Sequence, residues 1–220
     1  MKSVFLGCCS FYETLLSTIH SLLAEKGDNF MIQVKDIYGN LPTLETERLR
    51  LRKVTKKDVR DMFEYASNEK VSRYVNWEKH RKLKDTKEFV SFVLKQYSNQ
   101  SISPWAMEIK ALKKCIGTID FVTWNPTHRI AEIGYAISEA YWNKGFVTEA
   151  AEKVIAFGFE EMDLVRIQAR CFVENAASEK VMKKIGMSYE GTIRKAMFIK
   201  GAHQDLKLYS ILREEYTRNA

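Results

Sequence analysis

Two spacings of apolar residues alternate along the chain and predict strands and helices in turn. Apolar residues at every second position, as in ERLRLRKV, are typical of a strand with one buried face. Apolar residues three or four positions apart are typical of a helix packed on a core. The first spacing predicts strands over residues 47–54, 105–110, 115–125 and 164–172, and two more near the C-terminus. The second predicts helices over residues 55–67, 85–97, 149–162 and 175–185.

Capping patterns locate the starts of two of these helices. Thr55 and Asp58 form a capping box, and residues 85–88 (DTKE) predict a second helix that begins at Asp85. Residues 71–83 between them predict a short helix and a loop. The apolar face expected for the second helix is formed by Phe89, Val90, Phe92, Val93 and Tyr97.

The first 43 residues form a separate segment. Residues 11–27 predict a helix that ends near Gly27, and residues 31–43 predict a strand or extended linker with a turn near Gly39. A helix of this length cannot expose an apolar stripe to water without a partner, so we expect it to dock on the rest of the chain or on a second subunit. The stripe consists of Phe11, Leu15, Ile19 and Leu22.

The most informative stretch is EIGYAISEAYWNKGFVTEA, residues 132–150. Alternating apolar residues predict a strand through Ile137, a polar turn contains the single glycine Gly145, and a strongly helical segment follows. This arrangement directs free backbone N–H groups and the positive end of a helix dipole at one point, which suits a phosphate. A purely structural turn is the alternative interpretation.

Composition narrows the class of protein. The chain has 220 residues, 45% hydrophobic and 29% charged, and carries a net charge of +7, of which residues 1–43 contribute −1 and the remainder +8. No apolar run approaches the ~20 residues of a membrane span, and the short apolar start is too brief for an export signal, so we expect a cytoplasmic protein. Cysteines and histidines lack metal-ligand spacing, which predicts no metal site and leaves Cys115 and Cys171 as buried free thiols.

Residues 142–147 (WNKGFV) resemble the acetyl-CoA pyrophosphate loop of the GNAT N-acetyltransferases, Gln/Arg-x-x-Gly-x-Gly/Ala, with Trp142 and Val147 as departures. Three further segments resemble the branch that contains the Rim-type ribosomal-protein-alanine N-acetyltransferases. These segments are Leu44–Val54, Val173–Gly191 and His203–Tyr216.

The resemblance implies an α/β (α+β) domain over residues 44–220, preceded by the helical extension and linker of residues 1–43. Its central sheet is expected to be mixed and mostly antiparallel, flanked by helices, with the strand through Ile137 splayed from the strand of residues 164–172 to admit acetyl-CoA. The residues implied to hold the cofactor are Ile137, Asn143, Lys144, Gly145, Phe146, Val147, Thr148, Asn175 and Ser178.

The same resemblance implies direct attack of an amine on the thioester within a ternary complex. Glu132 and Glu190 are the candidates to receive the amine proton, and Ser178 is the candidate to protonate the thiolate. The alternatives are that Glu132 orients a backbone group or an arginine, that Glu190 flanks a turn, and that Ser178 lies in a capped first turn. The residues expected on the acceptor side, or alternatively in the core, are Tyr74, Trp77, Trp105 and Tyr135.

The acceptor predicted from the branch is the N-terminal α-amine of a ribosomal protein. An α-amine with a pKa near ~8 is largely neutral at physiological pH, whereas a lysine near ~10.4 must lose its proton at a cost of roughly 4 kcal/mol. The basic domain suits a polyanionic cofactor and a ribosome-associated partner, or is simply a solvated surface. Alternatives are a small-molecule amine or antibiotic, or a non-catalytic acyl-CoA-binding module. A homodimer is possible, and neither a membrane nor direct nucleic-acid binding is required.

Overall fold

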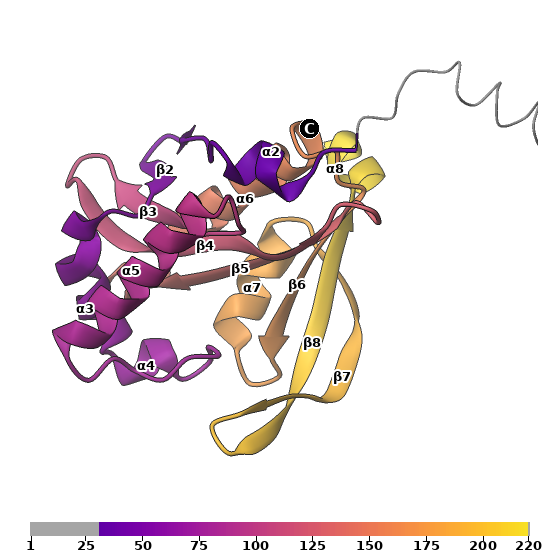
Figure 1. Ribbon diagram of the computed structural model, residues 1–220. Coiled ribbons are helices and arrows are strands. Elements are labelled where there is room, and N and C mark those ends of the chain that lie inside the picture. Colours follow the sequence, from indigo (N-terminus) through magenta and orange to yellow (C-terminus); the bar gives the residue numbers. More distant parts are fainter. Residues whose placement is uncertain (1–30, 220) are drawn as a thin grey trace, which may run out of the picture. The chain divides into compact units, whose positions relative to one another are not determined.

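The strands of the protein pair into one mixed sheet. The computed structural model describes residues 31–219, and within them eight strands pair in the order β1-β2-β3-β4-β5-β6-β8-β7 (Figure 1). Every neighbouring pair is antiparallel except β5 and β6, which are parallel. This confirms the predicted mixed, mostly antiparallel sheet. The strands are β1 (Leu44–Glu45), β2 (Leu49–Lys53), β3 (Trp105–Ile109), β4 (Lys114–Asn125), β5 (Ile130–Ile137), β6 (Arg166–Phe172), β7 (Ser188–Ile199) and β8 (Ala202–Leu212).

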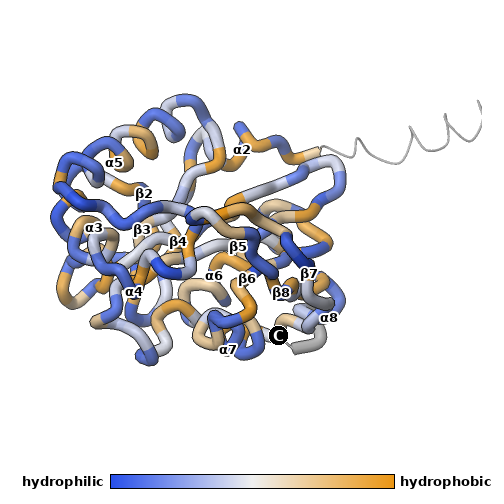
Figure 2. Tube along the Cα trace, turned by 90° about the horizontal axis from the view of Figure 1, so that it is seen from below, coloured by the Kyte–Doolittle hydropathy of each residue, from blue (hydrophilic) through white to orange (hydrophobic). Residues whose placement is uncertain are grey.

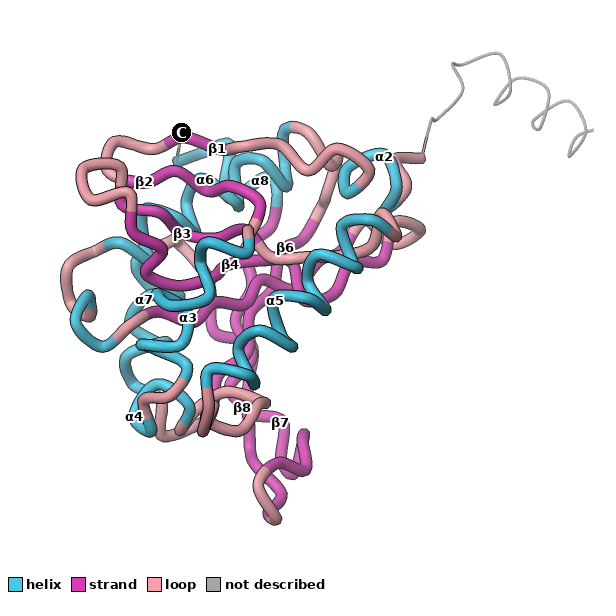
Figure 3. The backbone as a smooth tube through the Cα atoms, turned by 60° about the vertical axis from the view of Figure 1, so that its left-hand side comes forward, coloured by secondary structure: helices cyan, strands magenta, loops and turns pink. Residues whose placement is uncertain are grey.

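Helices cover both faces of the sheet. One face packs against α6 and α7, and the other packs against α3, α4 and α5 over β2, β3 and β4. Strands β7 and β8 extend past the helices as a long hairpin (Figure 3). The helices are α2 (Val34–Tyr38), η1 (Lys56–Asp58), α3 (Val59–Ala66), α4 (Glu69–Ser72), α5 (Leu83–Ser98), η2 (Glu139–Tyr141), α6 (Phe146–Glu160), α7 (Ala176–Lys184) and α8 (Arg213–Asn219).

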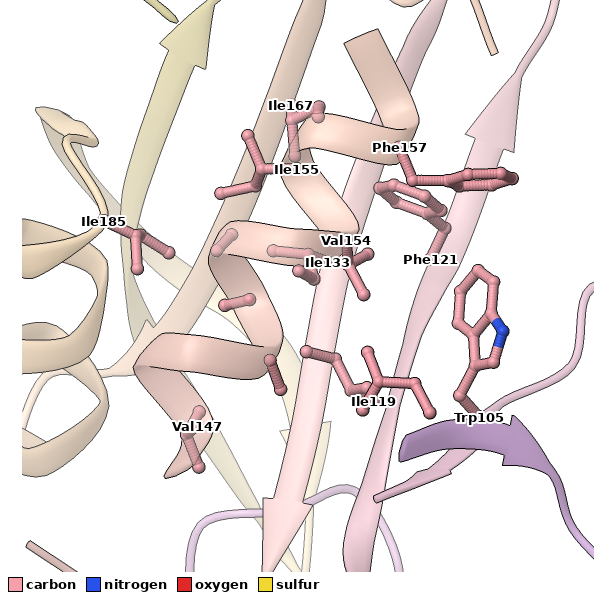
Figure 4. Packing of buried hydrophobic residues seen from close by; sticks show 14 of the residues in the cluster. Trp105, Ile119, Phe121, Ile133, Val147, Val154, Ile155, Phe157, Ile167 and Ile185 are labelled. Carbon is pink, nitrogen blue, oxygen red and sulfur yellow. The ribbon is translucent and has the colours of Figure 1, made fainter. Parts of the chain in front are cut away.

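The larger hydrophobic core lies between α6 and the sheet (Figure 4). Apolar and polar segments alternate along the trace of strands and helices, as their spacing in the sequence predicts (Figure 2). Val154 and Phe157 of α6 pack against side chains of the central strands, among them Trp105, which is fully buried. The Trp105 indole also donates to the carbonyl of Pro42 at 2.7 Å. Trp105 is therefore a core residue and not part of an acceptor wall.

Residues 32–43 pack with the sheet in one unit and do not form a strand. The predicted strand or extended linker is wrong at its centre, where the short helix α2 forms and ends at Gly39. Asp36 accepts a hydrogen bond from the backbone N–H of Gln33 at 2.8 Å, and Tyr38 and Leu41 are buried, so tertiary packing overrides the local pattern. The helix predicted over residues 11–27 lies outside the described residues.

Helix α5 begins two residues earlier than its capping pattern predicts. Its first residue is Leu83, and the Asp85 carboxylate accepts the backbone N–H groups of Arg81 and Lys82 at 2.7 and 3.0 Å. Asp85 therefore caps the helix from inside its first turn. The predicted apolar face is wrong at Phe92, which is 57% exposed. The capping box of Thr55 and Asp58 is confirmed, with Thr55 N–H donating to Asp58 Oδ2 at 2.7 Å.

Candidate active site

The parallel strands β5 and β6 pair at one end only. Ile130, Ala131 and Glu132 pair with Arg166, Ile167 and Gln168, and the remaining residues of both strands have no partner across this gap. Strand β5 stays paired with β4 up to Ile137, so the gap opens on its β6 side. This confirms the predicted splay, and it leaves backbone N–H and C=O groups of β5 without a partner strand on this side.

The loop before α6 lies where β5 ends. Asn143 and Gly145 adopt left-handed conformations with φ of 58° and 80°, and α6 begins at Phe146. The first backbone hydrogen bond of α6 runs from Glu149 N–H to Gly145 C=O at 3.0 Å. The N–H groups of the preceding residues therefore have no partner within the helix and, together with the helix dipole, form an anion-directed loop, one suited to bind an anion.

Arg48 fastens this loop to the rest of the domain, a role that no local pattern in the sequence indicates. Its Nε contacts Glu149 Oε2 at 2.6 Å, its Nη1 donates to the carbonyl of Lys144 at 3.0 Å, and its guanidinium lies 4.4 Å from the centroid of the Phe146 ring. Burial opposes ionisation of Glu149, but hydrogen bonds from Thr46 and Arg48 lower the pKa of its carboxyl.

The two departures from the loop pattern are accommodated without blocking the loop. Val147 is 9% exposed and joins the core beneath α6, so its side chain turns away from the anion-directed N–H groups. The Trp142 indole donates to the carbonyl of Ile137 at 3.1 Å and so ties the loop to the end of β5. Lys144 Nζ lies 5.3 Å from the ring centroid of Tyr141, which places a cation beside the loop.

Ser178 connects α7 to Tyr135 of β5. Its Oγ lies 2.8 Å from the hydroxyl of Tyr135, and Asn175 caps α7 by accepting the Ser178 N–H at 3.1 Å. Burial raises the pKa of the Tyr135 phenol, which keeps it protonated. Ser178 thus lies in a capped first turn, as the predicted alternative has it, with Asn175 as the cap, and it belongs to a hydroxyl pair that the sequence did not reveal.

Glu132 lies at the closed end of the gap and is held by two partners. Its carboxylate accepts from Arg170 Nε at 2.9 Å and from Gln168 Nε2 at 3.1 Å. Its side chain is 9% exposed. The geometry matches the predicted alternative, in which Glu132 orients an arginine.

Glu190 lies on β7, beside Arg166 of β6. Its Oε1 contacts Arg166 Nη1 at 2.6 Å and accepts from the Ser210 hydroxyl. These hydrogen bonds, that of Arg166 first, lower the pKa of the Glu190 carboxyl. Arg166 also approaches Gln168, so polar contacts run from Glu190 across β6 to Glu132.

A cavity of about 290 Å³ lies at the far end of β6. The Tyr74 and Phe172 rings meet there with centroids 5.9 Å apart. Lys200 at the tip of the β7–β8 hairpin donates to the carbonyl of Ser72 in α4 and brings hairpin and helix together. Trp77 packs beside the smaller core of α3 and α5 instead. The lining residues are Arg73, Tyr74, Phe172, Glu174, Ile199, Lys200 and Gln204.

Among residues 31–219 there is no cluster of His, Cys, Asp and Glu able to hold a metal ion, and none of their helices is long and apolar enough to cross a membrane. Cys115 and Cys171 are buried free thiols, as predicted, and burial raises their pKa values to about 12 and about 11.

Comparisons with known proteins agree with this geometry. The acetyltransferase (GNAT) domain family matches residues 48–188. The uncharacterized N-acetyltransferase YoaA of Bacillus subtilis is 36% identical over 172 residues, which cover 78% of this chain and 97% of that protein. The crystal structure of a GNAT-family acetyltransferase from Bacillus anthracis has 32% identity and a TM-score of 0.71, and the match covers 79% of this chain and 99% of that one.

The name of a third relative states its acceptor. The ribosomal-protein-serine acetyltransferase of Escherichia coli is 32% identical over 95 residues, which cover 43% of this chain and 53% of that protein. The family match, the splayed strands and the anion-directed loop lead to one conclusion. The chain belongs to the GNAT family of acetyltransferases, whose members use acetyl-CoA.

Proposed function

We propose that the protein transfers the acetyl group of acetyl-CoA to a primary amine by direct attack in a ternary complex, with the N-terminal α-amine of a ribosomal protein as acceptor, in the cytoplasm. One observation carries the proposal. The gap between β5 and β6 has the anion-directed loop beside its open end and the Ser178–Tyr135 hydroxyl pair at its side.

The unpaired edge of β5 suits the chemistry of the cofactor. The amides of a pantetheine arm can satisfy the unpaired backbone groups of β5 in place of a neighbouring strand, from Ile137 inward, except for the Ile137 carbonyl, which accepts from the Trp142 indole. The diphosphate would lie on the backbone N–H groups of residues 143–148. A Cβ at Gly145 would lie 3.3 Å from Arg48 Nη2, a tight contact, and residues with a side chain rarely adopt a φ of +80°, so glycine is favoured here. Asn175 and Ser178 would contact the pantetheine from α7.

The hydroxyl pair suits the departing thiolate. When the C–S bond breaks, its electron pair stays on sulfur and a proton is needed there. Ser178 Oγ can donate that proton, and the Tyr135 hydroxyl 2.8 Å away can replace it. Glu132 and Glu190 are each bound to an arginine. Their contacts favour positioning of Arg170 and Arg166 over direct uptake of the amine proton.

The acceptor assignment rests on chemistry and on similarity. An α-amine is largely neutral near pH 8 and needs less help from a base than a lysine does. The cavity bounded by Tyr74, Phe172 and the hairpin offers aromatic walls together with polar groups for a short peptide end. The similarity to a ribosomal-protein-serine acetyltransferase supports the same choice.

Cofactor binding is tested with two matched aspartate substitutions. Gly145→Asp places a carboxylate where the diphosphate would bind, and acetyl-CoA affinity measured by calorimetry should fall by about tenfold or more. Gly201→Asp is the control, because Gly201 has the same φ of +80° but no neighbouring atom within 4 Å of its Cβ position. Equal affinity of the Gly145→Asp variant and the control would place the cofactor elsewhere.

The acceptor is tested in two further measurements. Thiol release from acetyl-CoA should be fastest with peptides that copy ribosomal-protein N-termini, compared with lysine side chains and small amines. Intact masses of ribosomal proteins from cells with and without the gene should differ by one acetyl group on at least one protein. An unchanged set, with turnover retained for a small amine, would reassign the acceptor.

A further inference from the structure

We propose that Asp120 is the catalytic residue that takes the proton from the attacking amine. This inference rests on the proposed function and assigns a role that neither Glu132 nor Glu190 fills. Asp120 lies on β4, directly opposite Gly134 of β5. Gly134 is the second residue beyond Glu132, where pairing between β5 and β6 ends, so Asp120 lies beside the closed end of the gap.

The Asp120 carboxylate lies beside β5 at Gly134, at ordinary van der Waals distance from the Cβ position of that glycine. A Cβ at Gly134 would lie 3.8 Å from Asp120 Oδ1 and 2.6 Å from Val122 Cγ1. Val122 is 45% exposed, whereas Asp120 itself is half-buried. Because the diphosphate is assigned to the loop beyond Ile137, a pantetheine arm running inward along β5 brings its thioester end toward Gly134.

The register also places Asp120 on the polar face of the sheet. Residues opposite each other on antiparallel strands share a face, as do residues two apart on one strand. Asp120 is opposite Gly134, and Gly134 is two residues from Glu132. Asp120 and Glu132 therefore face the same side, opposite to the side of Ile133 and Tyr135, where α6 and Ser178 lie. The proton acceptor and the hydroxyl pair thus flank β5 from opposite faces.

Among the carboxylates on this face, Asp120 alone is left without a bound donor in residues 31–219. Glu132 is paired with Arg170 and Glu190 with Arg166, whereas no hydrogen bond or ion pair of the described residues includes Asp120. The titratable groups that face it are Glu132, Tyr38 of α2 and Tyr97 of α5. Burial raises the pKa values of both tyrosines, so they remain neutral beside it.

The environment of Asp120 gives it the basicity that proton uptake requires. Desolvation raises the pKa of its carboxyl from 3.8 to about 7. A base is most effective when its pKa lies near the working pH, because it is then both ionised and able to hold a proton. An arginine-bound carboxylate such as Glu190, with its lowered pKa, is a much weaker acceptor.

The transfer balances in atoms and charge. As the N–C bond forms, the amine nitrogen loses a proton to the Asp120 carboxylate, directly or through one water. The C–S bond then breaks, the sulfur keeps the electron pair, and it takes a proton from the Ser178 hydroxyl. Asp120 releases its proton to solvent and Ser178 regains one through Tyr135. The products are the acetylated amine and the free thiol of CoA.

The test measures kcat against pH at saturating acetyl-CoA with two acceptors whose amine pKa values differ. For the parent protein we expect an acidic limb near pH 7 at the same position for both amines, because it belongs to the enzyme. Asp120→Asn should remove that limb and lower kcat by roughly a hundredfold or more, with acetyl-CoA affinity unchanged by calorimetry. The control is Asp163→Asn, which changes an exposed aspartate paired with Arg129 and Arg213.

The possible outcomes separate the two proposals. An active parent whose Asp120→Asn variant keeps its kcat and its acidic limb overturns the role of Asp120 alone. A parent that acetylates no amine overturns the proposed function and this role with it. If Asp120→Asn does not fold, the pH dependence of kcat in the parent protein decides the role of Asp120. An acidic limb near pH 7 that is common to both amines supports the role, and the absence of that limb overturns it.

Discussion

Replacing Arg48 by alanine should loosen the loop that receives the diphosphate. The change removes the 2.6 Å ion pair with Glu149, the 3.0 Å hydrogen bond to the Lys144 carbonyl and the contact with the Phe146 ring. Glu149 keeps its hydrogen bonds from Thr46 and from the backbone N–H of residue 48, so its carboxylate is not left without hydrogen-bond donors.

The expected magnitude follows from the exposure of the arginine. Its side chain is 42% exposed, so solvent screening limits the ion pair to about 0.2–1 kcal/mol. The hydrogen bond contributes about 1 kcal/mol and the ring contact about 0.5–1 kcal/mol, and the three overlap. A loss of about 2 kcal/mol in the free energy of unfolding corresponds to a melting temperature lower by roughly 4–8 °C.

The acetyl-CoA affinity of Arg48→Ala shows whether Arg48 positions the loop for the cofactor or only stabilises the fold. If the Lys144 carbonyl loses its anchor, ordering even one loop residue on binding costs about 1–2 kcal/mol, which is roughly a tenfold loss of acetyl-CoA affinity. Calorimetry on Arg48→Ala measures that loss. Arg50→Ala is the matched control, because Arg50 lies two residues away on β2 and pairs with Glu45 and Glu108 instead of with the loop. A lowered melting temperature with unchanged affinity would refute the reasoning.

Three further changes test other parts of the structure. Tyr135→Phe removes the partner of the Ser178 hydroxyl and should lower kcat more than it changes acetyl-CoA affinity, as steady-state rates and calorimetry would show. Arg52→Ala leaves the buried Asp58 without its cation and Glu108 with only the 3.4 Å contact to Arg50, and it should lower the free energy of unfolding by about 3–5 kcal/mol in chemical denaturation. The raised pKa of Asp120 means that the folded state holds more protons than the unfolded state, so stability should fall by up to about 4 kcal/mol as pH rises from about 4 to about 7, and Asp120→Asn should abolish that dependence. Melting curves across this pH range measure it, and an identical dependence in the variant would contradict the assignment.

Sequence patterns predicted the parts of the fold that depend on neighbours along the chain. The strands, the loop around Gly145 and the α7 cap at Asn175 follow from local periodicity and turn chemistry, and the family resemblance supplied the splayed sheet. The partners of the site residues were not predictable in this way. Arg48 and Glu149 are 101 residues apart, and Glu132 and Arg170 meet only because β5 and β6 pair at that point. Helix α2 was missed because the burial of Tyr38, not its local pattern, decides its conformation.

The proposed site is built from two stretches that lie far apart in the sequence, and the hairpin of β7 and β8 belongs to the second of them. The loop over residues 143–148 and the strand before it form a continuous segment, whereas Ile199, Lys200 and Gln204 of the hairpin line the cavity from the far end of the chain. On the proposed function, substitutions at the hairpin tip alter which amine is admitted without touching the groups that hold the cofactor. Acceptor preference can therefore diverge between relatives through a short, peripheral stretch of chain, and the hairpin tip is the natural place to redirect this enzyme by design.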